Sequence, residues 1–256
     1  ISFKGIGKKH VWDVRKRYRK NMKIVIKMKI LVTGSEGFIG KHLCRELKRR
    51  KIKFTICDLK NACDVTKTTI TSYENFDCVV HLAAELSNDA IKCHKNNILA
   101  TQKLVEFCKW KGIPLIFTSS CAIYGEGNYP KNNYGFSKLI AEEYVKTLPH
   151  YTILRLSNVY GEGGKGVINK FIESMQKNES LILKDSMRDF IHIKDVVKMI
   201  MLQLKKKQKK IYNVSTGRSV FVGDTIGMIQ KHFPNSWVDV FAKSLNEDEI
   251  KVSSKI

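Results

Sequence analysis

The spacing of apolar residues predicts alternating strands and helices along most of the chain. Five short apolar runs predict buried strands at 29–34, 53–58, 76–84, 114–120 and 151–157. Apolar residues at helical spacing follow the first strand, and two amphipathic segments predict helices at 96–112 and 134–148. This alternation is typical of an α/β fold with a doubly wound parallel sheet, a Rossmann fold.

The same pattern divides the chain into three regions. Residues 1–27 form a basic N-terminal extension that we expect to be poorly ordered, because "MKILVTG" at 28–34 has the character of a natural start. Residues 28–160 form the Rossmann domain. After residue 160 the pattern loosens, so we expect 161–256 to form a small C-terminal substrate lobe, interleaved with the last Rossmann elements and truncated at its C-terminal end.

Length and composition limit the function classes. A chain of 256 residues can bury one core with a small appended lobe. No apolar run approaches the ~20 residues of a membrane span, so no membrane partner is expected. The seven cysteines show no C-x-x-C spacing, which indicates no metal site and favours a reduced, cytoplasmic setting.

The net charge of +22 is the one feature that suggests nucleic acid. Much of it is local, since residues 1–27 hold ten Lys or Arg against one Asp, and "KKKQKK" at 205–210 forms a second cluster, expected to be a solvated turn after a helix. There is no zinc finger or RNA-binding aromatic pattern, so nucleic acid is not expected as a partner. A basic surface also suits a small polyanion such as a nucleotide diphosphate.

A glycine-rich loop joins the first strand to the first helix. "TGSEGFIG" places Gly34, Gly37 and Gly40 at the spacing of a dinucleotide-binding turn. Gly34 can make the turn, Gly37 lets the backbone approach a pyrophosphate, and Gly40 lets the helix lie close to the sheet. The N-terminus of the helix supplies N–H groups for the phosphates.

Asp58 ends the second strand, about 20 residues after the loop, where a carboxylate can bind the adenosine ribose hydroxyls. A carboxylate there repels a 2′-phosphate, so NAD is favoured over NADP. Asp64, slightly further on, can accept a hydrogen bond from the adenine amino group.

Tyr134 and Lys138 in "YGFSK" lie one helical turn apart on one face. A nearby ammonium would stabilise the phenolate and lower the pKa of the tyrosine from about 10. Ser120 ends a buried strand at the carboxyl edge of the sheet, where ligands bind in open α/β folds. Ser120 could therefore bind the same substrate oxygen that Tyr134 protonates or deprotonates.

These motifs together resemble a known family. "TGSEGFIG", "HLAA" at 81–84, "SSCAIYG" at 119–125, "YGFSK", "LRLSNVYG" at 154–161 and "RDFIHIKDV" at 188–196 occur in the order found in extended short-chain dehydrogenases. The resemblance is to the NAD-dependent epimerase/dehydratase family, whose members act on sugar nucleotides, and it spans about 28–256.

The resemblance implies roles for individual residues. Ser120, Tyr134 and Lys138 would form the catalytic triad, and Lys138 would also bind the nicotinamide ribose. Asn158 would contact the sugar nucleotide, and Arg188 would pair with its diphosphate. Asn97 would pin its helix to the sheet. Further cofactor contacts are expected from Phe38, Ile39, Val65, Leu82, Ala83 and Ala84.

The two residues after Ser120 narrow the choice of reaction. Dehydratases of this family resemble one another in carrying an Asp-Glu pair there, whereas this chain has Cys121 and Ala122, so dehydration is not expected. The expected activity is epimerisation of a nucleoside-diphosphate hexose by transient oxidation at carbon 4. An NADPH-dependent 4-keto-sugar reductase and a non-catalytic NAD-binding regulator are the alternatives. Both intervals, from Ser120 to Tyr134 and from Asn158 to Arg188, are short for such epimerases.

The two predicted helices at 96–111 and 134–148 carry apolar residues beyond their sheet-facing stripes, including Trp110, Leu139 and Tyr144. By resemblance, they would pair with their copies in a two-fold homodimer.

Overall fold

The computed structural model describes residues 28–61, 63–65, 75–125, 129–179, 181–183, 186–233, 239–243 and 249–253. The basic extension expected at 1–27 lies outside these residues.

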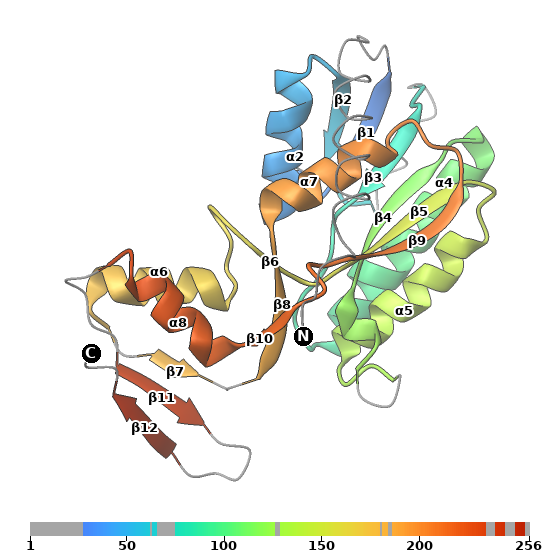
Figure 1. Ribbon diagram of the computed structural model, residues 1–256. Helices are drawn as coiled ribbons and strands as arrows, with labels where there is room; N and C mark the ends of the chain where they lie inside the picture. The colour runs from blue at the N-terminus through green and yellow to red at the C-terminus, as the bar shows by residue number, and fades with distance from the viewer. Residues whose placement is uncertain are drawn as a thin grey trace, which may run out of the picture.

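A parallel sheet of six strands forms the larger part of the molecule (Figure 1). Its strand order is β2-β1-β3-β4-β5-β9, so the order reverses between β1 and β3, and ligands bind beyond the carboxyl ends of strands at such a point. The strands are β1 (Lys29–Thr33), β2 (Lys53–Cys57), β3 (Cys78–His81), β4 (Leu115–Ser120), β5 (Tyr151–Leu156) and β9 (Lys209–Val214). The predicted fold class is confirmed.

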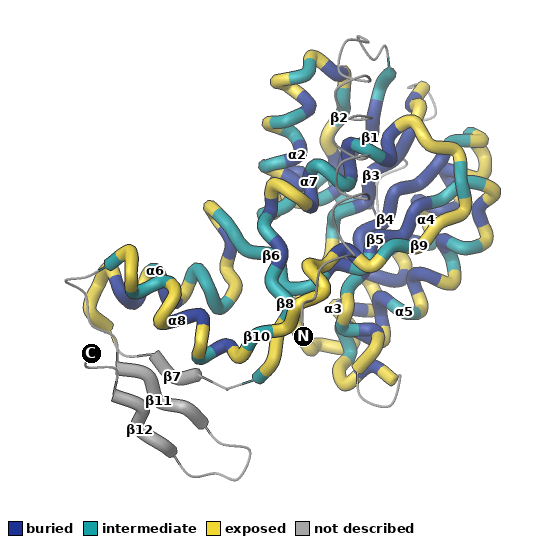
Figure 2. The backbone as a smooth tube through the Cα atoms, in the orientation of Figure 1, coloured by how far each residue is buried: buried dark blue, intermediate teal, exposed yellow. Residues whose placement is uncertain are grey.

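Helices cover both faces of this sheet because successive strand side chains point to opposite sides. Ile30 and Val32 of β1 pack in one core cluster with α2 (Phe38–Arg49) and α7 (Ile193–Gln203), while Leu31 packs in the other with α4 (Ala100–Lys111) and α5 (Asn133–Lys146). The four central strands β1, β3, β4 and β5 are therefore mostly buried, as Figure 2 shows in dark blue, whereas the edge strands β2 and β9 are partly exposed. Burial on both faces explains why the central strands are mainly apolar rather than alternating.

A smaller part lies beside the sheet and is connected to it by β6 (Asn158–Tyr160) and β8 (Met187–His192), which pair in parallel (Figure 1). β10 (Ser219–Phe221) pairs with β8. Helices α6 (Val167–Lys177) and α8 (Val222–Gln230) share a cluster of buried side chains, and a second small sheet contains β7 (Leu181–Leu183), β11 (Asp239–Lys243) and β12 (Glu249–Ser253).

Two predicted elements differ from the structure. The strand predicted at 76–84 is confined to β3, because the chain leaves the sheet after His81. The helix predicted from 96 begins earlier, as α3 (Ala90–Cys93), and passes through a π-helical stretch at His94–Leu99 before α4. A π-helical turn shifts the side-chain period, so a pattern search at the α-helical period finds only the part after that turn.

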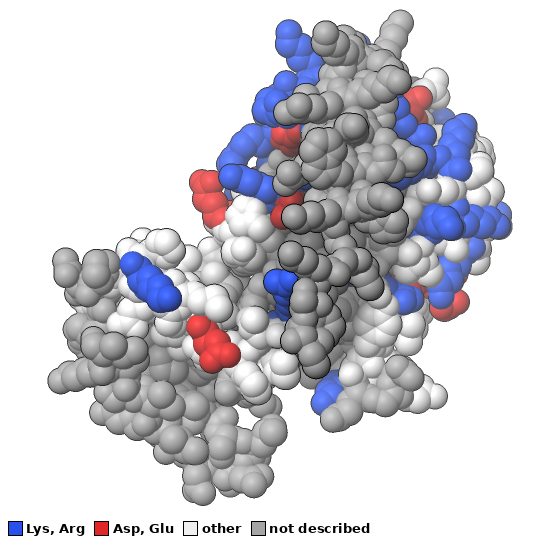
Figure 3. Space-filling view, viewed as in Figure 1, with Lys and Arg blue, Asp and Glu red and all other residues white. Residues whose placement is uncertain are grey.

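The lysine cluster at 205–210 is only partly a turn. It follows α7 as expected, but Lys209 and Lys210 begin β9 at the edge of the sheet. On the face seen in Figure 3, Lys and Arg side chains gather over the part that holds the parallel sheet, with few acidic residues among them. Within the described ranges, no helix is long and apolar enough to cross a membrane.

Candidate active site

The glycine loop between β1 and α2 packs directly against the end of β3. Gly34 has a φ of +70°, and a Cβ there would lie 2.5 Å from the backbone nitrogen of Ala83. Gly34 is therefore required by both its backbone conformation and its surroundings. A Cβ on Gly40 would lie 2.1 Å from the Gly34 carbonyl oxygen. Glycine is therefore required at this position by the close backbone of the loop itself, whereas close packing of the helix on the sheet was expected.

The loop leaves polar groups available to an anion. Gly37 is the N-cap residue of α2 and provides no side-chain cap, and the first turn of the helix contains no acidic residue. The hydroxyl of Ser35 is buried and has no hydrogen-bond partner among the described residues. An uncapped helix N-terminus beside an unpartnered hydroxyl fits the pyrophosphate of a dinucleotide.

Asp58 follows β2 and holds the loop from the other side. One carboxylate oxygen accepts the Glu36 N–H and the other accepts the Lys60 N–H, each at 3.0 Å. The carboxylate thus lies beside the glycine loop, where the sequence predicted it.

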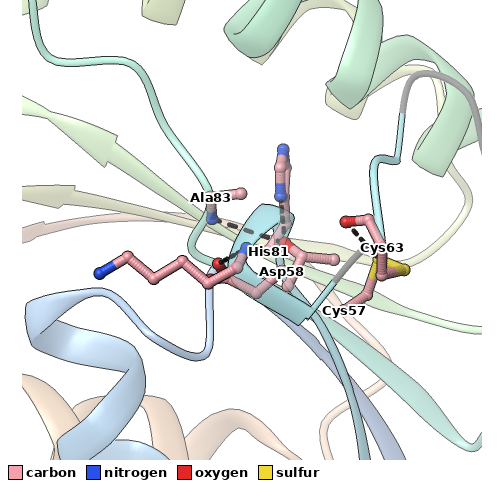
Figure 4. The surroundings of a disulfide bond; sticks show 7 residues. Cys57, Asp58, Cys63, His81 and Ala83 are labelled. Atoms are coloured by element: carbon pink, nitrogen blue, oxygen red, sulfur yellow. Dashed lines mark hydrogen bonds between the residues drawn. A yellow bond between two sulfur atoms is a disulfide. The ribbon is translucent and has the colours of Figure 1, made fainter.

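A disulfide between Cys57 and Cys63 closes the short segment that contains Asp58 (Figure 4). The expectation that the cysteines are reduced is therefore wrong for this pair. The two residues are brought together by the turn after β2, which C-x-x-C spacing does not describe. The remaining described cysteines, Cys44, Cys78, Cys93, Cys108 and Cys121, are free.

The other predicted cofactor residues occupy different environments. Val65 is buried in the core, whereas Ala84 is exposed. The Ala83 N–H donates to the Thr33 hydroxyl at 3.5 Å (Figure 4). The remaining members of the set are partly buried: Phe38, Ile39, Asp64 and Leu82.

Ser120 and Tyr134 meet at the carboxyl edge of the sheet. Ser120 ends β4, and its hydroxyl accepts the Ala122 N–H at 3.1 Å as the cap of a short 3-10 helix at Cys121–Ile123. Gly135 lets the start of α5 approach that turn, since a Cβ there would lie 2.6 Å from the Ala122 carbonyl oxygen. Burial raises the pKa of the Tyr134 phenol, and a hydrogen bond with the Ser120 side chain partly opposes this.

Lys138 lies one turn after Tyr134 and is buried, with 2% of its surface exposed. Its ammonium donates to the Thr118 carbonyl at 2.8 Å and lies 4.5 Å from the centre of the Phe117 ring. Burial lowers the pKa of Lys138 to about 7, and the charge of Glu142 opposes the shift. The expected lowering of the Tyr134 pKa is absent here, because burial outweighs any stabilisation of the phenolate.

Asn97 lies in the π-helical stretch and fastens three segments together. Its side chain bonds both backbone groups of Glu85, at 2.7 and 3.0 Å, and donates to the Ser137 hydroxyl at 2.8 Å. It therefore joins its helix to the loop after β3 and to α5, rather than to the sheet as the resemblance implied.

The predicted substrate residues lie on β6 and β8. Asn158 donates to the Asp189 carbonyl at 3.2 Å, and the exposed Arg188 donates to the Met187 carbonyl. Burial raises the pKa of the Cys121 thiol and the charge of Arg188 opposes this, so Arg188 acts on the residue that follows Ser120.

Sequence reasoning missed a buried ion pair in this region. Glu142, four residues after Lys138, pairs with Arg155 of β5 at 2.7 Å. The spacing of Tyr134, Lys138 and Glu142 on one face could have indicated it, because a carboxylate on a core-facing helix stripe requires a partner. Across the described residues, no group of three or more His, Cys, Asp or Glu could hold a metal ion.

Comparison with known proteins gives concordant results. The model of the NAD dependent epimerase/dehydratase family matches residues 30–215. A "Putative UDP-glucose 4-epimerase" of Methanocaldococcus jannaschii is 31% identical over 250 residues, covering 78% of this chain and 81% of that protein. The dTDP-4-dehydro-6-deoxyglucose reductase of Escherichia coli is 27% identical and covers 78% of this chain and 80% of its own. The structure of MoeE5 in complex with UDP-glucose and NAD superposes with a TM-score of 0.76 at 25% identity, over 86% of this chain and 87% of that one.

Proposed function

Because this chain belongs to the NAD-dependent epimerase/dehydratase family, and is thus an NAD-dependent enzyme of the extended short-chain dehydrogenase type, we propose that it epimerises a nucleoside-diphosphate hexose at carbon 4. The observation that carries the proposal is that Ser120 at the end of β4 and Tyr134 at the start of α5 lie at the carboxyl edge of the sheet, with the buried Lys138 one turn further along α5. The similarity to a protein described as a UDP-glucose 4-epimerase supports the choice of reaction.

The cofactor is held between the glycine loop and the end of β2. The N–H groups at the start of α2 and the Ser35 hydroxyl bind the pyrophosphate, and Asp58 binds the adenosine ribose. Ala83, which packs against Gly34, would also contact the cofactor. When bound, NAD supplies reversible hydride transfer at the sugar carbon.

The protein residues move the proton and hold the substrate. Ser120 orients the sugar hydroxyl, and Tyr134 takes its proton and later returns it. The buried ammonium of Lys138 would bind the nicotinamide ribose. Arg188 holds the diphosphate through its planar guanidinium, while Asn158 contacts the nucleotide sugar. In this arrangement 28–160 binds the cofactor, and 161–256 completes the sugar-nucleotide site.

The second candidate function is reduction of a 4-keto sugar nucleotide, which is favoured by the similarity to the Escherichia coli reductase. Asp58 favours the epimerase, because its carboxylate opposes the 2′-phosphate of NADPH. A non-catalytic NAD-binding regulator is supported by the short substrate region but opposed by the complete set of Ser120, Tyr134 and Lys138.

We also propose that the protein is a homodimer that works in the cytoplasm. Exposed apolar side chains on α4 and α5, including Trp110 at 64% exposure, support the first part. The free cysteines support the second, whereas the Cys57–Cys63 bridge opposes it.

The test is a panel of UDP-, GDP- and dTDP-hexoses with NAD, read by product sugar and by NADH absorbance. An epimerase yields an isomer without net NADH, and a reductase consumes NADPH with a 4-keto sugar. Tyr134→Phe should lower turnover by about 10²–10⁴-fold and leave NAD binding intact. Tyr144→Phe, which removes a hydroxyl from the same helix, is the matched control. Full activity of Tyr134→Phe would refute the assigned proton carrier.

A further inference from the structure

A buried ion pair lies next to the proposed catalytic residues and has no part in the proposed mechanism. Glu142 is completely buried, and the Arg155 side chain is 17% exposed. The guanidinium contacts both carboxylate oxygens, with Nε at 3.0 Å from Oε1 and Nη2 at 2.7 Å from Oε2. This geometry is bidentate, so it fixes the orientation of both groups as well as their separation.

The pair connects α5 to three strands of the sheet. Arg155 of β5 lies in register with Ser119 of β4 on one side and with Asn213 of β9 on the other. Its remaining nitrogen Nη1 donates to the Tyr124 hydroxyl at 2.8 Å, and that hydroxyl donates to the Asn213 side chain at 2.6 Å. Tyr124 immediately follows the turn that Ser120 caps.

One rigid connection therefore reaches both halves of the catalytic set. Tyr134, Lys138 and Glu142 follow one another at intervals of four along the same face of α5. A bidentate bond at Glu142 fixes the rotation and axial position of this face against β5. The bond to Tyr124 fixes the turn that carries Ser120.

Stability alone does not account for such a pair. Replacing a buried ion pair by apolar residues of similar volume is often neutral or stabilising, because desolvation offsets the attraction between the charges. Displacement of a reacting group by about 1 Å, in contrast, can lower a rate by about 10²-fold. The bidentate pair at this position therefore acts by fixing the positions of the neighbouring groups rather than by adding stability.

We propose that Glu142 and Arg155 are positioning residues, which set the distance between Tyr134 and Ser120 and supply the negative charge that holds the Lys138 ammonium in the apolar interior. The inference assumes the catalytic roles given under Proposed function. It adds two residues to which neither the sequence nor the resemblance assigned a role.

The charge part of the proposal depends on the groups that face Lys138. From β4 it meets the Thr118 carbonyl and the Phe117 ring, and from β3 it faces His81. Burial lowers the pKa of His81 to about 3, and its ring nitrogens are bonded to Thr33 and Thr101, so this histidine is neutral.

From α5, Lys138 faces Tyr134 and Glu142. Burial lowers the Lys138 pKa, and the carboxylate of Glu142 opposes this and raises it. Removing this charge must lower the Lys138 pKa further below about 7, so that less of the ammonium form is present at a given pH.

The experiment compares Glu142→Gln with the parent across pH 6 to 9, by NAD binding and by turnover. The amide oxygen still accepts one bond from Arg155, while the charge and the second bond are lost, so urea unfolding of the variant is measured alongside. We expect the alkaline fall of both NAD affinity and kcat to move to lower pH by about one unit, which is about tenfold on the falling limb. Glu143→Gln is the matched control, because Glu143 is exposed and pairs with Lys146 of the same helix. Its profiles should superpose on the parent's.

Two more variants separate geometry from charge. Arg155→Lys keeps the positive charge but loses the two N–H groups that bind both oxygens of Glu142. We therefore expect a lower kcat at every pH, with the alkaline fall of kcat at the same pH as in the parent. The double variant Glu142→Met with Arg155→Met should unfold at a denaturant concentration similar to that of the parent. Its turnover should nevertheless be lower, and its NAD affinity should fall at a lower pH than that of the parent.

The proposal is overturned if NAD affinity and kcat of Glu142→Gln fall at the same pH as those of the parent, or if the double variant is as active as the parent. If the parent itself turns over no sugar nucleotide, the proposed function fails. The NAD-binding profiles of Glu142→Gln and Glu143→Gln still decide the inference in that case.

Discussion

Gly34→Ala is the sharpest test of how this chain forms its cofactor loop. The residue has a φ of +70°, which costs an alanine roughly 1–2 kcal/mol. The new Cβ would also lie 2.5 Å from the nitrogen and 2.7 Å from the Cα of Ala83. Both are backbone atoms of the segment that follows β3 and cannot rotate away as a side chain would, so overpacking adds about 1–3 kcal/mol. The expected loss is therefore about 2–5 kcal/mol in the free energy of unfolding.

Two other glycines provide matched controls. Gly112 ends α4 with a φ of +65° but has nothing within 4 Å of its Cβ position, so Gly112→Ala should cost only the conformational term of roughly 1–2 kcal/mol. Gly227 lies inside α8 and also has open space around it, so Gly227→Ala should stabilise by roughly 0.5–1 kcal/mol.

The assay is urea unfolding followed by tryptophan fluorescence, together with calorimetric titration of NAD. Gly34→Ala should also weaken NAD binding by at least about tenfold, because relief of the clash displaces the glycine loop or the backbone at Ala83. Gly112→Ala should bind NAD like the parent. If Gly34→Ala is no less stable than Gly112→Ala, the close approach of the loop to β3 is wrong.

The remaining predictions concern the cofactor, the bridge, the dimer and pH. Asp58→Ala should weaken NAD binding by about tenfold or more and narrow its advantage over NADP, and equal affinity of the parent for both would contradict the role of Asp58. Serine at both Cys57 and Cys63, or a dithiol reductant, should lower the free energy of unfolding by about 2 kcal/mol, and an unchanged urea midpoint would exclude the bridge. Ile140→Glu, in the exposed face of α5, should convert a dimer to a monomer by light scattering, whereas a parent that is already monomeric at micromolar concentration would refute the dimer. Because the folded Lys138 pKa of about 7 lies below the unfolded value of 10.5, the parent should gain stability as pH rises between these values, and Lys138→Met should abolish that slope in urea titrations.

The parallel sheet could be predicted because its four central strands are buried on both faces, which makes them mainly apolar runs. Gly34 and Asp58 could be placed because their roles depend on distance along the chain from β1 and on the end of β2. Both signals are local. The placement of Ser120 and Tyr134 also arises from local signals, since Ser120 ends a strand and Tyr134 lies at the start of a helix.

Other features depend on contacts that no local pattern encodes. The Cys57–Cys63 bridge needs the turn after β2 to bring two sulfur atoms together, and that turn has no cysteine-spacing signature. The π-helical stretch around Asn97 interrupts the helical period that was used to find the helix. The lysine was expected to tune Tyr134, but its burial was not foreseen, because a long cationic side chain is ordinarily found at the surface.

The burial of Lys138 and the Glu142–Arg155 pair are two consequences of one arrangement. An ammonium enclosed by Phe117 and the β4 backbone would lose its proton near neutral pH, and Glu142 supplies the charge that opposes this. A carboxylate as deeply buried as Glu142 is itself costly without a partner, and Arg155 provides both hydrogen bonds and charge. Arg155 can do so from β5 because the strand register places it next to α5 and beside the Ser120 turn. A cation in the active site thus requires a chain of alternating charges that ends at the partly exposed Arg155, and this requirement, rather than stability, is the physical reason for an ion pair inside the core.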